Sequence, residues 1–197
     1  MTSPDSSRME VRFTGFGGQG MVVMGYIVGR AATVFDGKNA TMTQSYGPEA
    51  RGGASSAGIV ISSGPIFYPY VIEPHVLVAM SQAGYDMYRK NLVKGGRLLI
   101  DEDLVTPAPD EDISRVFRIP ATRFAEELGR KIVANIVMLG FFSALTGYVD
   151  DASIRKAVSD AVPKPTIPLN LKAYDKGRSH ALENRDTSQF SSPQERK

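Results

Sequence analysis

The sequence has no cysteine and only two histidines, His75 and His180. The absence of cysteine excludes disulfide bonds, thiolate catalysis, cysteine-ligated zinc and any iron–sulfur cluster bound by this chain. Two histidines are too few for a histidine-rich metal centre and argue against a His-based catalytic triad. The sequence therefore assigns no catalytic and no metal-binding residue to this chain.

A long apolar run and an excess of charge of one sign are also absent. No apolar segment reaches the ~20 residues that span a bilayer, and residues 1–9 are polar and unlike a signal peptide. The 23 basic and 21 acidic residues leave a net charge of +2, which gives no indication of a nucleic-acid partner. Hydrophobic residues make up 42% and charged residues 22%, which is enough for one packed domain. We expect a cytoplasmic protein with no membrane span.

Strand-like and helix-like segments alternate along most of the chain. The predicted strands are 11–16, 39–43, 56–62, 76–80, 97–100 and 115–119, and the predicted helices are 21–35, 82–92, 122–128, 132–145, 152–162 and 169–176. This alternation predicts one three-layer α/β/α domain over residues 9–177, with a largely parallel, Rossmann-like sheet. Residues 178–197 are polar with few core formers, so we predict a C-terminal tail that is disordered or wraps a partner subunit.

Residues 15–20, Gly-Phe-Gly-Gly-Gln-Gly, have the spacing G-x-G-x-x-G between a predicted strand and a predicted helix. Glycines there let the chain turn tightly, expose backbone N–H groups and admit an anion at the helix N-terminus. The acidic residue that holds a ribose in dinucleotide-binding domains is missing after Thr43-Gln44-Ser45, and no Lys-Ser/Thr pair follows as in a Walker A loop. The loop is interpreted either as a site for a phosphate-bearing group or as a means of tight packing or of approach by a partner chain.

A second loop, residues 45–53, reads Ser-Tyr-Gly-Pro-Glu-Ala-Arg-Gly-Gly. It holds more glycine and charge than a plain hairpin turn requires. Arg51 beside two glycines could present its guanidinium to a phosphate or a carboxylate, and Glu49 could hold that arginine in place. A purely structural Glu49–Arg51 pair is the alternative interpretation.

The acidic run 101–103 and Asn135 are polar and lie near the ends of predicted strands or helices. Asp101, Glu102 and Asp103 follow a predicted strand, but three consecutive acids rarely converge on one cation, so we interpret them as a solvated strand end. Asn135 begins an apolar helix and could cap or bridge, and its role stays open at this stage.

The glycine loop and the second loop together resemble the gamma subunit, or gamma domain, of the 2-oxoacid:acceptor oxidoreductases, best known as ferredoxin-dependent enzymes. The resemblance spans roughly residues 10–177, and its pieces occur in the family's order. It is carried by Gly15–Gly20, Ser45–Glu49, Arg51–Gly53, Ser81–Ala83, Asn135–Gly140 and Asn170–Tyr174. Each piece alone is common, whereas the ordered set is specific.

The resemblance implies a role inside a larger enzyme. In this family thiamine diphosphate and Mg²⁺ act on a 2-oxoacid in the alpha and beta subunits, electrons pass through the iron–sulfur clusters of a ferredoxin-like subunit or domain, and coenzyme A takes the acyl group. This chain would assemble with those subunits and could shape the approach of coenzyme A. The candidate cofactor-binding residues are Gly17, Gly18, Gln19, Gly20, Ser45, Tyr46, Glu49, Arg51 and Gly52.

Two other functions stay open from the residues alone. The chain could be a free-standing dinucleotide-binding protein that uses only its glycine loop, or an assembly module with no ligand. The sequence does not decide which 2-oxoacid is used, nor whether electrons reach ferredoxin or NAD.

Overall fold

The computed structural model describes residues 8–46 and 54–184. The strands are β1 (Met9–Phe16), β2 (Asn39–Tyr46), β3 (Ala54–Ser62), β4 (Val76–Ala79), β5 (Arg97–Asp101) and β6 (Val116–Ile119). The helices are α1 (Met21–Arg30), α2 (Gln82–Tyr88), α3 (Ala121–Glu127), α4 (Ala134–Thr146), α5 (Asp151–Ala161) and α6 (Ile167–Glu183), and a π-helical turn over Ala31–Phe35 continues α1. The strand and helix order matches the sequence prediction.

All six strands form one sheet in the order β2-β3-β1-β4-β5-β6. The neighbours β1, β4, β5 and β6 pair in parallel, whereas β3 runs antiparallel to both β1 and β2. Five strands therefore share one direction, and the prediction of an α/β fold with a largely parallel sheet is confirmed. Because β3 is reversed, the carboxyl ends of β2 and β1 lie at the same edge of the sheet.

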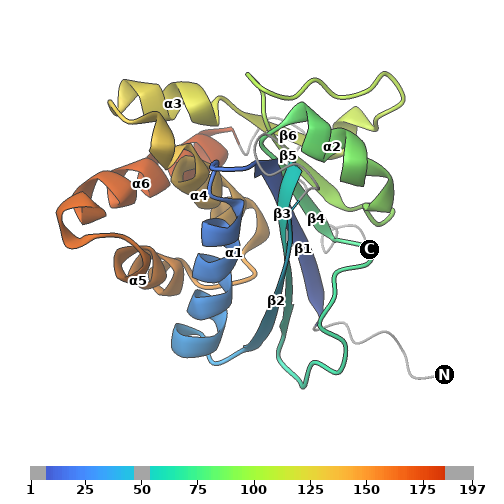
Figure 1. Ribbon diagram of the computed structural model, residues 1–197, viewed down its shortest axis with the longest axis horizontal. Helices are drawn as coiled ribbons and strands as arrows, with labels where there is room; N and C mark the ends of the chain where they lie inside the picture. The colour runs from blue at the N-terminus through green and yellow to red at the C-terminus, as the bar shows by residue number, and fades with distance from the viewer. Residues whose placement is uncertain (1–7, 47–53, 185–197) are drawn as a thin grey trace.

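The sheet separates two layers of helices (Figure 1). Helices α1, α4, α5 and α6 lie on one side, and α2 lies on the other. Alternate residues of β1 pack against the two helix layers. Val11 and Phe13 are fully buried in the larger core, while Thr14 contacts Gly84 of α2. This is the alternation expected for a strand that is covered on both faces.

Helices α4 and α6 cross in backbone contact at two glycines. A Cβ built on Gly140 would lie 1.9 Å from the carbonyl oxygen of Tyr174, and one on Gly177 would lie 1.8 Å from that of Val137. No other residue type fits either position without moving the helices apart. The Tyr174 hydroxyl, buried beside this crossing, lies 2.8 Å from both Ser143 Oγ and Asp151 Oδ1 and so ties α6 to α4 and α5.

The predicted C-terminal boundary needs a correction. The sequence predicts a tail from residue 178, but α6 continues to Glu183, and Ala181 is only 1% exposed in the core. Small residues at Ala173, Gly177 and Ala181 recur every four positions, so a helix places them on one face against α4. The remaining predicted tail, 185–197, lies outside the described residues.

Candidate functional site at the carboxyl edge of the sheet

The glycine loop lies at the edge of the sheet where β1 and its parallel neighbours end. After β1 the chain forms β2 and β3 on one side of β1, and it then crosses to form β4 on the other side of β1. In open α/β sheets, ligands bind in the crevice outside the carboxyl ends of the strands at such a reversal of strand order. The topology therefore selects the loop after β1 as the place to search for a site.

The glycine loop turns on two residues with positive φ. Gly18 has φ +90° and Gly20, the N-cap of α1, has φ +79°. Gly17 and Gly18 are exposed, and a Cβ on either would meet no atom of the described residues within 4 Å. The first-turn backbone N–H groups of α1 follow directly, at the positive end of the helix dipole. The outer side of the loop is thus open and rich in hydrogen-bond donors.

Gln19, a predicted cofactor-binding residue, has its side chain hydrogen-bonded within the protein. Its Oε1 accepts a hydrogen bond from the Phe16 N–H at 2.6 Å, and its Nε2 donates to the Met80 carbonyl at 2.9 Å. A Cβ on Gly15 would lie 2.6 Å from Gln19 Oε1, so the glycine makes room for this inward fold. Gln19 fastens the loop to the end of β4, which leaves the backbone of its neighbours as the part that faces outward.

Asn135, whose role was open, contacts the same loop. It is 7% exposed, and its Nδ2 donates to the Gly20 carbonyl at 3.4 Å. A Cβ on Gly20 would lie 2.3 Å from Asn135 Nδ2. Two features therefore require glycine at position 20: the left-handed backbone and the close approach of the asparagine. Asn135 also links α4 to the start of α1.

The second predicted loop reaches the same edge in part. Ser45 and Tyr46 end β2 and are exposed, and the Tyr46 hydroxyl donates to Gln44 Oε1 at 2.6 Å. In the strand registers Tyr46 pairs with Ser55, and Phe16 pairs with the neighbouring Ala54, so the two loops start at the same level of the sheet. The candidate residues Glu49, Arg51 and Gly52 lie outside the described residues.

Two adjoining hollows open beside the glycine loop, of about 250 Å³ and about 370 Å³. Gly18, Ile132 and Asn135 line both, and Ile132 is 71% exposed between them. Lys131 lines the smaller hollow with Thr122, and Arg130 lines the larger one. Sequence reasoning missed the two cations and Ile132, because they lie in the turn between α3 and α4, which the strand order brings to β1 only in three dimensions.

Asp101 is not a solvated strand end. It is 0% exposed, and its Oδ2 accepts hydrogen bonds from the Thr122 N–H at 2.9 Å and hydroxyl at 2.6 Å, while Oδ1 accepts from the Asp103 N–H. Burial raises the pKa of Asp101, and the hydrogen bonds from Thr122 and Asp103 partly oppose that rise. Asp101 thereby fixes the start of α3 beside the smaller hollow. Glu102 and Asp103 pair with Arg123 and fit the predicted solvated position better.

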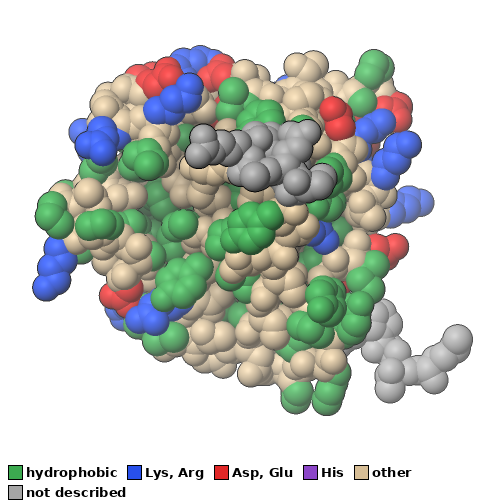
Figure 2. Space-filling model, viewed as in Figure 1, with side chains coloured by type: hydrophobic (Ala, Val, Ile, Leu, Met, Phe, Trp, Pro, Cys, Tyr) green, Lys and Arg blue, Asp and Glu red, His purple; other side chains and the backbone are tan. Residues whose placement is uncertain are grey.

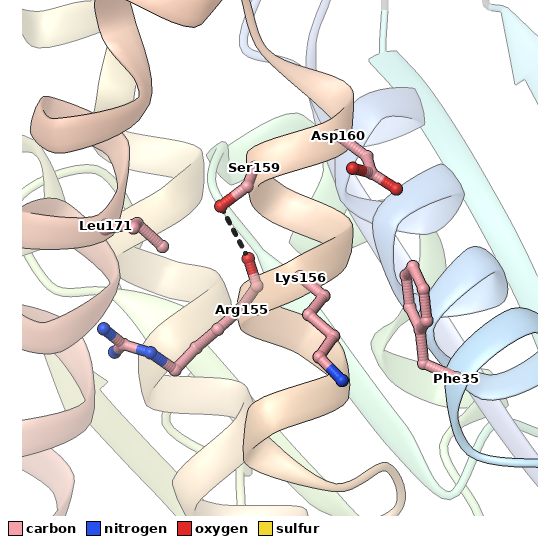
Figure 3. Close-up of a pocket in the computed structure, with 6 residues that line it drawn as sticks. All are labelled: Phe35, Arg155, Lys156, Ser159, Asp160 and Leu171. Atoms are coloured by element: carbon pink, nitrogen blue, oxygen red, sulfur yellow. Dashed lines mark hydrogen bonds between the residues drawn. The ribbon is translucent and has the colours of Figure 1, made fainter.

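A separate hollow of about 410 Å³ lies between the π-helical turn, α5 and α6 (Figure 3). Its charged side chains are already engaged. Arg155 pairs with Asp175, Asp160 with Arg30, and Lys156 Nζ lies 5.8 Å from the centre of the Phe35 ring. The Ser159 hydroxyl donates to the Arg155 carbonyl at 3.1 Å. These contacts stabilise the packing of α5, and the hollow lies away from the glycine loop.

Within residues 8–46 and 54–184, no three His, Asp or Glu side chains gather closely enough to hold a metal ion. In the same ranges, none of the helices combines the length and hydropathy that crossing a bilayer requires. Beside the glycine loop, the carboxyl edge offers backbone N–H groups, two cationic side chains and an exposed isoleucine.

Comparison with known proteins agrees with the resemblance seen in the loops. The family model described as pyruvate ferredoxin/flavodoxin oxidoreductase matches residues 10–180. The chain belongs to this family. Homologues of this chain are gamma subunits of 2-oxoacid:ferredoxin oxidoreductases, which are multi-subunit complexes. The chain is therefore a subunit of an oxidoreductase complex.

Two curated relatives illustrate the match. The 2-oxoglutarate synthase subunit KorC of Methanocaldococcus jannaschii is 51% identical over 179 residues, which cover 89% of this chain and 95% of that subunit. The ketoisovalerate oxidoreductase subunit VorA of Methanothermobacter thermautotrophicus is 36% identical over 92% of this chain but only 38% of its own length. In that relative the gamma-type sequence forms part of a longer polypeptide.

Solved structures share the fold. The gamma subunit of the keto/oxoacid ferredoxin oxidoreductase from Geobacter sulfurreducens is 42% identical, with a TM-score of 0.79 over 89% of this chain and 99% of that chain. The 2-oxoglutarate:ferredoxin oxidoreductase from Magnetococcus marinus, solved with 2-oxoglutarate, coenzyme A and succinyl-CoA bound, matches 90% of this chain and 32% of its own chain with a TM-score of 0.79. At 24% identity this second likeness concerns the fold alone.

Proposed function

We propose that this chain is the gamma subunit of a 2-oxoglutarate:ferredoxin oxidoreductase, which converts 2-oxoglutarate, coenzyme A and oxidised ferredoxin to succinyl-CoA, CO2 and reduced ferredoxin. The observation that carries the choice of substrate is the identity of 51% to a 2-oxoglutarate synthase subunit over 95% of its length. Identity to the ketoisovalerate enzyme's subunit is 36%. The choice of ferredoxin as acceptor follows the relatives.

Thiamine diphosphate with Mg²⁺ and the iron–sulfur clusters do not fit the residues of this chain. The sequence has no cysteine to ligate a cluster, and the described residues gather no carboxylate or histidine group for a metal ion. We assign these cofactors to the alpha and beta subunits and to a ferredoxin-like subunit or domain.

The role proposed for the chain is to form one wall of the coenzyme A path at its carboxyl edge. Coenzyme A carries phosphates and a largely uncharged pantetheine arm. The open backbone of Gly17 and Gly18 and the N-terminus of α1 suit a phosphate, and the exposed Ile132 suits the arm. Lys131 adds positive charge, because its pair with Glu126 at 3.4 Å is exposed and weak.

The test uses the complex assembled from this chain and its co-expressed partner subunits. Initial rates are measured with 2-oxoglutarate, pyruvate and 2-oxoisovalerate, with ferredoxin as acceptor, with and without this chain. We expect activity to require the chain and kcat/KM to be highest for 2-oxoglutarate. A complex that prefers pyruvate or 2-oxoisovalerate contradicts the substrate, and full activity without the chain contradicts the role.

A further inference from the structure

Strand β2 forms an open edge of the sheet. It pairs with β3 on one side only, and no described strand pairs with its other side. Its eight residues, Asn-Ala-Thr-Met-Thr-Gln-Ser-Tyr, include no charge and no proline. Soluble proteins usually protect an exposed edge with lysine, proline or a bulge, because unpaired backbone groups recruit another strand. This edge lacks those protections over its whole length.

The direction of the β2 backbone groups follows from the strand registers. The Thr14 carbonyl accepts a hydrogen bond from the Met80 N–H, so even-numbered residues of β1 face β4 and odd-numbered ones face β3. The β1–β3 register pairs odd-numbered residues with odd-numbered ones, so the even-numbered residues of β3 face β2. The β2–β3 register pairs those even-numbered residues with odd-numbered residues of β2, which are therefore the ones bonded to β3. Ala40, Met42 and Gln44 therefore point their N–H and C=O groups at the open edge.

An apolar stripe of α1 lies beside this edge. Tyr26 and Val34 are 48% and 56% exposed, and both lie on the side of α1 and its π-helical turn that borders β2. A groove of about 280 Å³, lined by Tyr26, Gly29, Val34, Ala40 and Met42 among others, separates the stripe from the strand. Figure 2 shows that the centre of this face is mostly hydrophobic and neutral, with most charges toward its rim. Such a face is typical of a protein interface.

We propose that β2 pairs with β2 of a second copy of this chain, so that two six-stranded sheets join into one across a twofold axis. Antiparallel self-pairing places outward-facing residues opposite outward-facing ones. Since β2 carries no charge, no like charges meet across the axis. Arg30, the charged residue that lines the groove, is already paired with Asp160 at 2.8 Å.

The same symmetry accounts for the helix stripe. A twofold axis perpendicular to the joined sheet keeps α1 of both copies on the same face, one on each side of the axis. The two stripes then flank the joint, and the groove at Gly29, where a Cβ would meet no described atom within 4 Å, provides room for the neighbour. One partner thus satisfies both the open backbone and the exposed apolar side chains.

Single-cysteine variants test the pairing, because the natural sequence has no cysteine and each variant carries one thiol. Cysteines are placed in turn at Thr41, Met42, Thr43 and Gln44, in the full chain and in the assembled complex, and oxidised mildly. We expect a disulfide-linked species of twice 21.4 kDa that peaks at Met42→Cys or Thr43→Cys. The yield should fall several-fold away from the axis, because a disulfide needs Cα atoms about 4.4–6.8 Å apart.

Met87→Cys on α2 is the matched control, since Met87 is 55% exposed on the other side of the sheet. Equal linking at β2 and at Met87, or no linking between copies, overturns the proposal. A β2 cysteine that links only to a different subunit in the complex also overturns it, and shows that another polypeptide covers the edge.

A proline variant tests the backbone bonds themselves. Gln44→Pro removes an N–H that faces outward and leaves the β2–β3 bonds intact, whereas Gln44→Ala removes the same side chain and keeps the N–H. By symmetry the proline deletes two hydrogen bonds, so the dimer dissociation constant from sedimentation should rise roughly tenfold or more. The alanine variant should stay within about twofold of the natural chain.

A proline variant that is folded by circular dichroism and dimerises like the natural chain overturns the proposal, as does a natural chain that is monomeric at every concentration. The pairing does not depend on the proposed chemistry. A complex that pairs through β2 but does not use 2-oxoglutarate counts against the proposed function alone.

Discussion

Two pairs of glycines in this chain serve opposite needs. Gly140 and Gly177 lie at the crossing of α4 and α6, where an added Cβ would meet backbone at 1.9 and 1.8 Å. Gly17 and Gly18 lie in the loop after β1, where an added Cβ would meet no described atom within 4 Å. The first pair is required by packing inside the domain. The second pair leaves open space that the described residues do not use, which favours a ligand or a partner at the carboxyl edge.

The largest expected effect is at the helix crossing. Gly177→Ala forces the Val137 carbonyl and α6 apart, and we expect a loss of more than about 3 kcal/mol in the free energy of unfolding, or no soluble protein. Urea denaturation of the full chain measures it. Gly17→Ala is the matched control and should change the free energy by less than about 0.5 kcal/mol. Equal effects of the two substitutions would show that the two pairs do not differ.

Gly20 should show an intermediate effect, because it combines both needs. Gly20→Ala places a Cβ at φ +79° and 2.3 Å from Asn135 Nδ2. We expect a loss of about 2–4 kcal/mol, of which about 1–2 kcal/mol comes from the left-handed backbone. Adding Asn135→Ala should recover the steric part, and a double-mutant cycle measures that coupling. Strictly additive losses would mean that the asparagine does not restrict this position.

Thr122→Val tests the anchor beneath the smaller hollow. It removes a hydroxyl that donates to Asp101 Oδ2 at 2.6 Å, so we expect a loss of about 1–3 kcal/mol near neutral pH. The pKa of Asp101 is already raised by burial and should rise further without that donor. The ionised form is then the disfavoured one in the folded state, so the loss should shrink as falling pH protonates Asp101. Urea denaturation at neutral and acidic pH measures the difference, and a pH-independent loss contradicts this origin.

Much of the fold could be predicted from the sequence, because it is encoded locally. The strand-like and helix-like segments found in the sequence correspond to the strands and helices of the fold, and at the start of α2 Ser81 accepts a hydrogen bond from the Gly84 N–H at 3.2 Å. The glycine loop was also found, since its spacing between a strand and a helix is a local signal. The end of α6 was predicted too early, because its last turns are polar on the outside and are stabilised by α4 through Gly177 and Ala181.

The site was only partly predictable, because its parts are distant in the sequence. The predicted role of Gln19 in cofactor binding stays a prediction. Its side chain bonds to Phe16 and to Met80, which lies 61 residues away, and no local signal in the sequence indicated the second contact. Lys131 and Ile132 carried no local signal, and only the order of the strands brings them beside Gly18. The predicted roles of Glu49, Arg51 and Gly52 stay predictions.

We propose that the open side of the glycine loop receives coenzyme A in the assembled enzyme. Gly17→Leu tests it most directly, because the added side chain enters space that the described residues leave empty. The measurement is the KM for coenzyme A of the assembled complex with 2-oxoglutarate, alongside the free energy of unfolding of the full chain. We predict a KM raised roughly tenfold or more, equivalent to about 1.4 kcal/mol, with unfolding changed by less than about 0.5 kcal/mol. An unchanged KM in an intact complex would show that coenzyme A does not contact the open side of the glycine loop.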